Sequence, residues 1–338
     1  MHKIVKFIKR DSRADEEFYY KKQLPNNSNV WKNCEFTFNP LNRKYDWLVI
    51  VDDIPKILKN GYEVLSCPDE NTILLTTEPS PITRYGRAFA NQFEYLITNQ
   101  EKEVLPHKNA TRSHTGNVWL YGKTYDEILK DTVSSSFKKK KKISTICSNK
   151  QMGHTIHKLR FDFTKRLQEE CPEITRCGWG FNPIDNKFDA IDDYEFHVCI
   201  ENHIAPHVWT EKLADAFLGY SIPIYYGCPN IYDYFPEDSI ILIDLNNFDE
   251  SITKIKKIIN TPGEYEKRFS ALQEARRRIL EEYNIFEMIS QIINNTPTNC
   301  QVSNKKIFNR RIMRAKYLPD LIRFIKFRIN NYLVNKKS

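Results

Sequence analysis

The sequence lacks several features that would fix its class at once. Its eight cysteines form no CxxC pair, and several lie inside apolar runs, as buried free thiols do, which favours a reducing compartment. No apolar run is long enough to span a membrane, and lysines interrupt the N-terminal run, so residues 1–17 resemble neither a signal peptide nor an anchor. Ten glycines and sixteen prolines in 338 residues exclude fibrous and disordered classes. No internal repeat is evident.

Positive charge is concentrated at one end of the chain. The net charge is +8, but residues 301–338 hold eleven Lys or Arg against the single Asp320, a net of +10, so the remainder carries 8 − 10 = −2. A nucleic-acid enzyme needs a cationic surface on its folded body, so this distribution argues against nucleic acid as the partner.

The length suits two domains of roughly 150 residues each. A break is expected at residues 134–142 (SSSFKKKKK), since three serines and five lysines resemble a linker. We therefore expect a first domain (1–137), a second domain (138–300) and a basic tail (301–338).

Apolar periodicity predicts an α/β fold with two parallel sheets. The expected strands are 2–9, 34–39, 47–51, 72–77, 93–98, 143–147, 194–200, 221–226 and 239–244. The expected helices are 54–60, 156–170, 208–218, 250–260 and 265–292. Two such domains facing a central cleft make the GT-B arrangement of sugar-transfer enzymes, although a fold alone does not fix function.

The most informative stretch is YEFHVCIENHIAPHVWTEKLADAFLGYSIPIYYGCPNIYDYFP, residues 194–236. A buried strand ends in Glu201 and Asn202, a Pro-containing loop follows, and the next helix opens with Thr210, Glu211 and Lys212. Ligands of parallel sheets bind at the carboxyl ends of strands, and free N–H groups at helix starts attract phosphates. Taken alone, a Glu–Lys pair is more often an ordinary solvated helix start.

This stretch resembles the donor-binding signature of family-10 glycosyltransferases, the alpha-1,3-fucosyltransferases. Residues 200–202 take the positions of the family's FEN, residues 210–212 those of TEK, and residues 222–227 those of the IPIYWG strand. The resemblance implies that Asn202, Glu211 and Lys212, together with Glu201 and Thr210, bind a guanosine diphosphate-sugar. One departure concerns the donor sugar: where the family commonly has Tyr, this chain has Val208, and the aromatic stands at Trp209.

Two further residues follow from the same resemblance. Residues 148–163 resemble the family's Ser-Asn loop and following Arg, which makes Arg160 a phosphate clamp; the alternative is a surface arginine on an amphipathic helix. Glu78, in a loop after a strand, resembles the family's acidic residue and is the candidate catalytic base; the alternative is a turn residue beside Pro79. Asp52 and Asp53 rank second as base.

Metal and cofactor chemistry is not indicated. Asp192 and Asp193 precede a strand and form no convincing DxD motif, so no obligatory metal is expected. Histidines 154, 157, 203 and 207 have no partner set at zinc spacing, so the pattern does not indicate a zinc site, although His203 and His207 lie in the donor loop.

The tail predicts a basic amphipathic helix. Between residues 305 and 337 six apolar residues fall on one helical face: Leu318, Leu321, Ile322, Ile325, Ile329 and Leu333; Phe327 falls elsewhere. Such a helix lies in the headgroup layer of an anionic membrane, unless it packs on the protein's own surface.

These observations predict an inverting glycosyltransferase, cytoplasmic and peripheral on the inner face of the membrane. The resemblance implies that the Rossmann-like domain 1–137 takes the acceptor and that the domain 138–300 binds the nucleotide sugar. It further implies transfer of L-fucose from GDP-fucose to a hydroxyl of a glycan acceptor such as lipopolysaccharide or a lipid-linked oligosaccharide. Two alternatives stay open: the same machinery with another nucleotide sugar, and a non-catalytic basic protein that binds membrane or RNA.

Overall fold

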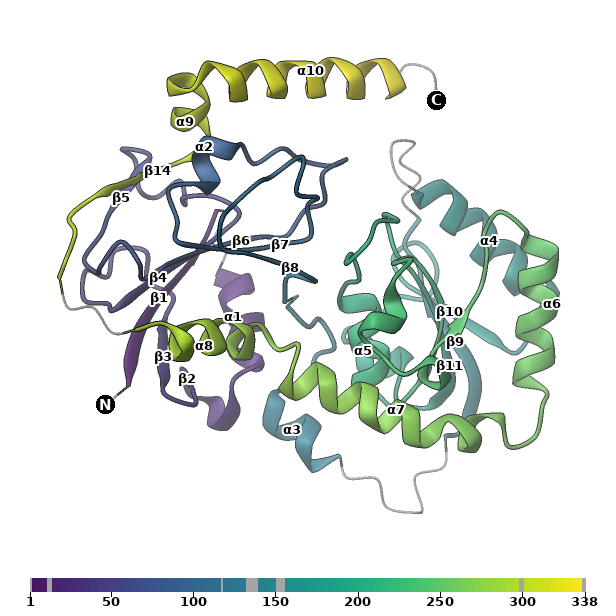
Figure 1. Cartoon of the computed structure of the whole chain (residues 1–338). Coiled ribbons are helices and arrows are strands. Elements are labelled where there is room, and N and C mark those ends of the chain that lie inside the picture. The colour runs from purple at the N-terminus through teal and green to yellow at the C-terminus, as the bar shows by residue number, and fades with distance from the viewer. Residues whose placement is uncertain are drawn as a thin grey trace. The chain divides into compact units, whose positions relative to one another are not determined.

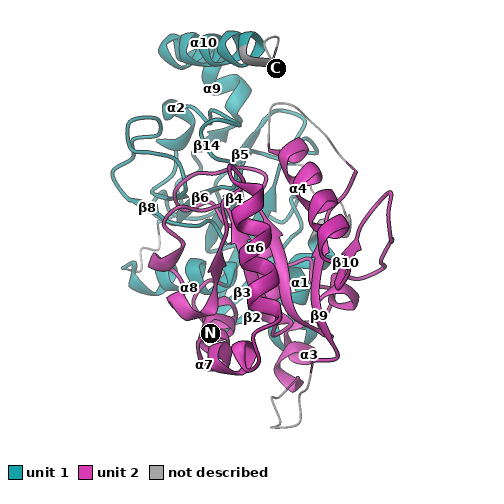
Figure 2. Cartoon of the chain, turned by 90° about the vertical axis from the view of Figure 1, so that its right-hand side faces the viewer, with its two compact units in different colours: residues 1–117, 284–337 teal, residues 118–283, 338 magenta. Residues whose placement is uncertain are grey.

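The computed structural model describes residues 2–10, 14–116, 118–131, 139–149, 156–297 and 301–335. The chain forms two compact units (Figure 2): unit 1 comprises residues 1–117 with 284–337, and unit 2 comprises residues 118–283. These divisions differ from the expected boundaries at 137 and 300. Trp119 and Tyr121 are buried in the core of unit 2, and the chain from residue 284 onward returns to unit 1, so neither expected boundary coincides with a change of core.

Unit 1 contains a seven-stranded sheet in the order β2-β3-β1-β4-β6-β7-β8. All neighbours pair in parallel except β2 with β3. The strands are β1 (Lys3–Lys9), β2 (Val30–Trp31), β3 (Cys34–Thr37), β4 (Trp47–Val51), β6 (Thr72–Thr76), β7 (Tyr95–Thr98) and β8 (Ala110–Arg112). The five strands predicted for this half are confirmed, and the buried runs of β4 and β6 are those of strands covered on both faces.

Helices cover both faces of this sheet (Figure 1): α1 (Ala14–Lys22) and α8 (Ile285–Asn295) on one, α2 (Arg87–Ala90) and α9 (Arg310–Lys316) on the other. Phe286 of α8 packs edge-on against Phe36 with ring centroids 4.6 Å apart. The predicted helix 54–60 is wrong: hydrogen bonds from Leu58 to Pro55 and from Gly61 to Leu58 close successive turns there instead.

Unit 2 contains a five-stranded, all-parallel sheet in the order β10-β9-β11-β12-β13. Its strands are β9 (Lys141–Ile146), β10 (Ile174–Cys177), β11 (Tyr194–Ile200), β12 (Ile222–Tyr226) and β13 (Ile241–Leu242). In Figure 1, α4 (His157–Glu170) and α6 (Phe248–Ile259) lie on one face, and α5 (Glu211–Leu218) and α7 (Glu264–Glu281) on the other. The short helix α3 (Tyr125–Lys130) begins with a capping box at Thr124.

The predicted single helix 265–292 is two helices. α7 ends at Glu281, and Asn284 caps α8 because its side chain accepts a hydrogen bond from the Phe286 N–H at 3.0 Å. The Asn284 amide also donates to the carbonyl of Gln23 at 3.1 Å, which fixes the start of α8 in unit 1.

The lysine run is only partly a connector. Residues 132–138 lie outside the described residues. Lys139 donates to the carbonyls of Asp192 and Gly219 at 2.5 and 2.6 Å, and burial lowers its pKa to about 7. Lys140 pairs with Asp193 at 3.0 Å and Lys142 with Glu195 at 2.9 Å. These hydrogen bonds and ion pairs let the lysine run lead into β9, whose first two residues are Lys141 and Lys142.

The basic C-terminal segment begins as part of unit 1. Its first strand, β14 (Lys306–Phe308), pairs antiparallel with β5 (Tyr62–Val64), and Arg310 at the start of α9 donates to Asp53, Thr83 and Arg84. The last helix, α10 (Leu318–Asn335), leaves one apolar face exposed. Among the described residues no helix is both long and apolar enough to cross a bilayer.

Candidate active site

The site in unit 2 is built where β11 turns into α5. Glu201 follows β11 and is fully buried; its carboxylate accepts from the Thr210 N–H at 2.7 Å and from the Thr210 hydroxyl at 2.6 Å. The Thr210 hydroxyl in turn caps α5 by accepting from the Lys212 N–H. Because buried carboxylates persist only with such partners, Glu201 fixes the start of the helix.

Gly227, the glycine of the resembled strand motif, is required by close packing against the same carboxylate. A Cβ added there would lie 2.5 Å from Cγ of Glu201 and 2.5 Å from the hydroxyl of Tyr225. Those distances are well inside van der Waals contact, so a side chain at 227 would displace the anchor of α5.

A cavity of about 230 Å³ opens beside this junction. Four residues predicted to bind the donor line it: Arg160, Asn202, Glu211 and Lys212. Arg160, on α4, is 6% exposed and donates from Nη1 to Oδ1 of Asn202 at 2.8 Å. Its Nε is buried and has no hydrogen-bond partner among the described residues, so one donor of a buried guanidinium remains available for an oxygen ligand.

Lys212 lies among carboxylates. Its Nζ is 3.0 Å from the Thr210 hydroxyl, 3.3 Å from Oε1 of Glu211 and 3.4 Å from Oε2 of Glu201. Burial alone would lower the pKa of Lys212, but the charges of Glu211 and Glu201 outweigh it and raise the pKa. Burial alone would raise the pKa of Glu211, but Lys212 and Lys187 bring it down to about 2. Both groups are therefore charged at neutral pH.

Two charged residues at this cavity, Lys187 and Asp215, were missed by the sequence reasoning. The Lys187 Nζ lies 2.7 Å from Oδ2 of Asp215 and 3.8 Å from Oε1 of Glu211. Burial raises the pKa of Asp215 to about 6, against the opposing charge of Lys187. Asp215 stands one turn inside α5 and so could have been assigned to the same face as Glu211 and Lys212. Lys187 begins a short 3-10 helix (Lys187–Ala190) outside the motif-bearing stretch and carried no sequence signal.

Histidines contribute to the wall rather than to a metal centre. His157 and His197 line the cavity, and burial lowers the pKa of His197 to about 3, so this ring is neutral. His207 instead shares a hydrogen bond of 2.6 Å with the Tyr234 hydroxyl. His154 lies outside the described residues. Over the described ranges, no group of three or more His, Cys, Asp or Glu side chains gathers as metal ligands would.

Trp209 does not take the place of the tyrosine that Val208 replaces. Its ring is buried in an aromatic cluster, with centroids 5.2 Å from Phe235, 5.7 Å from Tyr283 and 5.8 Å from Tyr234. Val208 is buried as well. Neither side chain lines the cavity.

Glu78, the expected base, belongs to unit 1 and follows β6. Its side chain is exposed at the surface, while neighbouring protein atoms displace part of its hydration; this desolvation, followed by the charge of Asp52, raises the pKa of the Glu78 carboxyl. Its own N–H donates to the Tyr85 hydroxyl at 3.1 Å, and its carbonyl accepts from Gln100 at 2.9 Å. The backbone of Glu78 is therefore held while its carboxyl remains accessible.

Asp52 and Asp53, the second-ranked bases, are occupied by structural bonds. Asp52 has φ +66° and accepts from the Thr77 N–H at 2.8 Å and from the Thr77 and Tyr85 hydroxyls at 2.7 and 2.5 Å. Asp53 accepts from the N–H groups of Ile54 and Arg310, both at 2.9 Å. Asp52 therefore orders the chain next to Glu78, whereas Asp53 holds the start of α9.

The described cysteines add no further chemistry to the site. Seven are free and buried, and burial raises the pKa of several thiols, including Cys67 to about 12 and Cys228 to about 11. Such thiols are protonated and unreactive at neutral pH.

Comparison with known proteins gives three findings. Alpha-(1,3)-fucosyltransferase FucT of Helicobacter pylori is 38% identical over 78 residues, which are 23% of this chain and only 16% of that relative. A solved alpha1,3-fucosyltransferase with GDP-fucose superposes with a TM-score of 0.53 at 18% identity, over 89% of this chain and 92% of that one. An OtsA apo structure superposes with a TM-score of 0.52 at 8% identity, over 88% and 100%.

At these identities the solved structures show the fold, which is that of GT-B glycosyltransferases, as the strand pattern predicted. The family is shown by sequence: residues 136–318, more than half of the chain, match the C-terminal part of glycosyltransferase family 10 (fucosyltransferase). This match spans the whole β11–α5–β12 region that builds the cavity. The chain therefore belongs to glycosyltransferase family 10, the fucosyltransferase family.

Proposed function

We propose that this protein is an inverting glycosyltransferase that binds a nucleotide-sugar donor in the cavity of unit 2. The observation that carries the proposal is the convergence of Arg160, Asn202, Glu211 and Lys212, from two helices and a strand end, on one cavity at the carboxyl edge of a parallel sheet. Open parallel sheets bind nucleotides at that edge.

The leaving group would be stabilised by two cations and a helix start. As the sugar bond breaks, negative charge develops on the departing diphosphate. Lys212 supplies a fixed positive charge, and Arg160 supplies a guanidinium group whose buried Nε–H has no partner among the described residues. The N–H groups at the start of α5 add the positive end of the helix dipole. In this proposal Asn202 and Glu211 bind nucleotide and sugar hydroxyls, while Glu201 and Thr210 support the donor site by positioning Lys212.

GDP-fucose is the donor we propose. The support comes from the family and from the solved alpha1,3-fucosyltransferase that carries GDP-fucose. A second candidate is another nucleotide sugar, and one observation favours it: Val208 stands where the family commonly has Tyr, and neither Val208 nor Trp209 lines the cavity.

Glu78 is the proposed catalytic base, which takes the proton of the acceptor hydroxyl as the sugar gains oxocarbenium character. Its support is the raised pKa of an accessible carboxyl whose backbone is held by Tyr85 and Gln100. A base whose pKa lies closer to the working pH accepts a proton more effectively than an ordinary carboxylate.

The acceptor we propose is a membrane-associated glycan, such as lipopolysaccharide or a lipid-linked oligosaccharide, with α10 lying on an anionic membrane at the cytoplasmic side. Leu318, Ile322, Ile325, Ile329 and Leu333 are each between 45% and 63% exposed on one face of α10. Phe327, which the apolar pattern left unexplained, packs instead under Arg84 of unit 1 at 5.2 Å. An exposed apolar stripe on a basic helix is the pattern of interfacial helices.

A donor panel tests the proposal. Release of nucleotide is measured with GDP-fucose, GDP-mannose, UDP-glucose and UDP-N-acetylglucosamine, and the expected result is release from GDP-fucose alone. Turnover with another donor selects the second candidate. Absence of nucleotide binding, together with loss of all membrane or RNA binding after truncation at residue 300, selects the non-catalytic alternative.

A further inference from the structure

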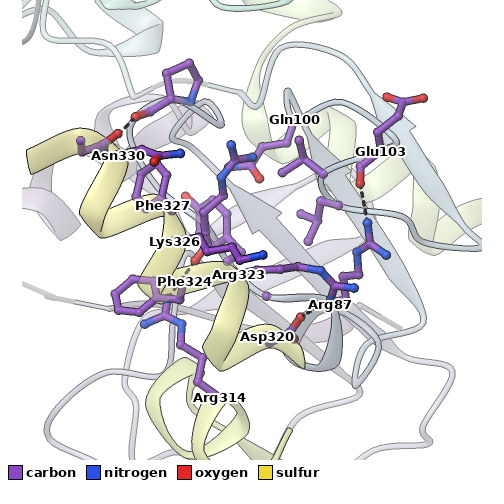
Figure 3. Close-up of a pocket in the computed structure, with 17 residues that line it drawn as sticks. Arg87, Gln100, Glu103, Arg314, Asp320, Arg323, Phe324, Lys326, Phe327 and Asn330 are labelled. Atoms are coloured by element: carbon purple, nitrogen blue, oxygen red, sulfur yellow. Dashed lines mark hydrogen bonds and ion pairs between the residues drawn. The ribbon is translucent and has the colours of Figure 1, made fainter. Parts of the chain in front are cut away.

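Unit 1 contains a second cavity, which the donor chemistry does not use. It has a volume of about 590 Å³ and lies between α10 and residues 81–105 (Figure 3). Its lining includes five cationic side chains, Arg84, Arg87, Arg314, Arg323 and Lys326, against the two acidic residues Glu103 and Asp320. The α10 pocket, as we name it, therefore has an excess of three positive charges.

The two acidic residues do not pair with the remaining cations of the pocket. Asp320 is 4% exposed and is committed to the protein, since it accepts from the Ala88 N–H at 2.8 Å and from Arg323 at 3.1 Å. The Glu103 carboxylate is exposed and points away from the other labelled side chains in Figure 3; only its backbone carbonyl faces the pocket, where it accepts from Arg87.

Three of the cations have hydrogen-bonding capacity to spare. The Nε of Arg87 is buried and has no hydrogen-bond partner among the described residues. Arg84 makes a cation–π contact with Phe327, and no described carboxylate pairs with it. Lys326 likewise has no ion-pair partner in the described part of the chain, and in Figure 3 it extends from α10 toward the segment that carries Arg87. Unpaired positive groups around one cavity match an anion that carries several acceptor oxygens.

Contacts within the protein hold the two walls of the pocket. Arg314 stacks on Phe324 at 3.9 Å and donates to the carbonyl of Arg84 at 2.8 Å. Gln100 donates to the carbonyls of Glu78 and Thr83 at 2.9 and 3.0 Å. These contacts fix the backbone of both walls, so binding of an anion needs to order mainly the side chains that donate to it.

We propose that the α10 pocket binds a phosphate group, with Arg84, Arg87 and Lys326 as its donors. Guanidinium groups favour phosphate because each presents paired N–H donors, and the volume leaves room for the glycerol or sugar to which a phosphate ester is attached. The phosphate can belong to a membrane lipid or to a soluble ester, and the two sources are separable by experiment. The site goes beyond the donor chemistry and stands whether or not unit 2 binds GDP.

The test compares two double variants that lose the same charge. Arg84→Gln with Lys326→Gln removes two pocket donors. The control, Arg311→Gln with Arg328→Gln, removes two exposed charges of residues 301–335, the segment that also contains Lys326. Neither Arg311 nor Arg328 lines the pocket. Circular dichroism on heating checks that both variants fold.

In the first arm glycerol 3-phosphate is titrated by calorimetry; in the second, protein is floated with phosphatidylglycerol–phosphatidylcholine vesicles. The pocket variant is expected to bind at least tenfold more weakly than the control variant in one arm or both. A difference in the first arm identifies a soluble phosphate, and a difference confined to vesicles identifies a lipid.

Equal weakening of both variants would overturn the proposal, because diffuse charge would then explain binding. Absence of binding in both arms would also overturn it. A measurement on the unaltered protein covers the case in which the pocket variant fails to fold: glycerol 3-phosphate or the vesicles should slow reductive methylation of Lys326 at least fivefold relative to Lys316. Unchanged rates under both conditions would contradict the proposal.

Discussion

The cavity of unit 2 and the α10 pocket of unit 1 both gather positive side chains, but they balance that charge differently. The cavity of unit 2 is lined by two lysines, and each lies beside a buried carboxylate: Lys212 beside Glu201 and Lys187 beside Asp215. In the α10 pocket, Arg84 and Lys326 have no carboxylate partner among the described residues, and the only buried acid, Asp320, is held by a backbone N–H. The first cavity places its lysines by ion pairs, while the second keeps positive side chains that no described carboxylate compensates.

This difference has a consequence for function. Carboxylates that fix a lysine also moderate its attraction for a resting ligand, which suits a site where charge must be stabilised as it develops. An uncompensated pocket binds an anion that does not change its charge. This difference is consistent with the proposals of turnover at the cavity of unit 2 and static recognition at the α10 pocket.

The largest expected effect separates the roles of the two units. Glu78→Gln should lower the rate of sugar transfer by about 10²–10⁴-fold because the acceptor proton loses its base. GDP affinity, measured by calorimetry, should stay within twofold, since the nucleotide is assigned to unit 2. Equal loss of affinity and rate would show that Glu78 acts structurally.

The pH profile sharpens this assignment. The pKa of Glu78 is raised, chiefly by desolvation, and a base works only when ionised. The transfer rate should therefore fall as pH is lowered through a pKa above the ordinary glutamate range, and this limb should vanish in Glu78→Gln. A wild-type rate that is flat down to the ordinary glutamate range would remove Glu78 from the role of base.

Lys212→Met should lower kcat/KM for the donor by about 10²–10³-fold, the loss expected when a preorganised group that stabilises developing charge is removed. The matched control is Lys165→Met on α4, whose exposed lysine lies 3.9 Å from Glu169; this variant should retain full activity. Similar losses in both variants would mean that general charge, rather than the site, governs donor binding.

The pH dependence of the unfolding free energy tests the buried carboxyl of Asp215, which pairs with Lys187. Its pKa is about 6 in the folded chain, above the ordinary aspartate value, so the folded state binds the extra proton between those two pH values. The free energy of unfolding should therefore fall as pH rises from about 4 to 6, by roughly 3 kcal/mol in total. In Asp215→Asn this decrease should disappear from urea unfolding curves; an unchanged slope would contradict it.

The smallest expected effect concerns the anchor of α5. Thr210→Val removes the hydroxyl that caps the helix and bonds Glu201, and should cost about 1–2 kcal/mol of unfolding free energy. Asn247→Ala removes the cap of α6 and should cost a similar amount. Only Thr210→Val should also lower kcat, with KM less affected, because Lys212 loses its position; equal kinetics in both variants would leave Thr210 as a helix cap alone.

The sequence predicted the parts of this molecule whose signals are contiguous. β4 and β11 match their predicted bounds because long apolar runs favour buried parallel strands. Arg160 and Asn202 come together as expected from the family's pattern, although 42 residues separate them. Lys187 escaped prediction because its role depends on where a short 3-10 helix (Lys187–Ala190) packs beside Asp215 of α5.

The misses arise where distant segments decide the structure. β14 pairs with β5, more than 240 residues earlier in the chain, and no local pattern encodes such pairing. The helix predicted across residues 282–284 is broken by Asn284, whose cap and bond to Gln23 depend on unit 1. The α10 pocket likewise joins two segments of unit 1 whose arginines, taken singly, resemble an ordinary basic surface.

The central claim is that the start of α5 in unit 2 receives the diphosphate of a nucleotide. A crystal structure of the protein with GDP tests it most directly. We predict diphosphate oxygens within hydrogen-bonding distance of Nε of Arg160 and Nζ of Lys212. A nucleotide bound in unit 1, or bound in unit 2 with both of these side chains turned away from it, would contradict the account.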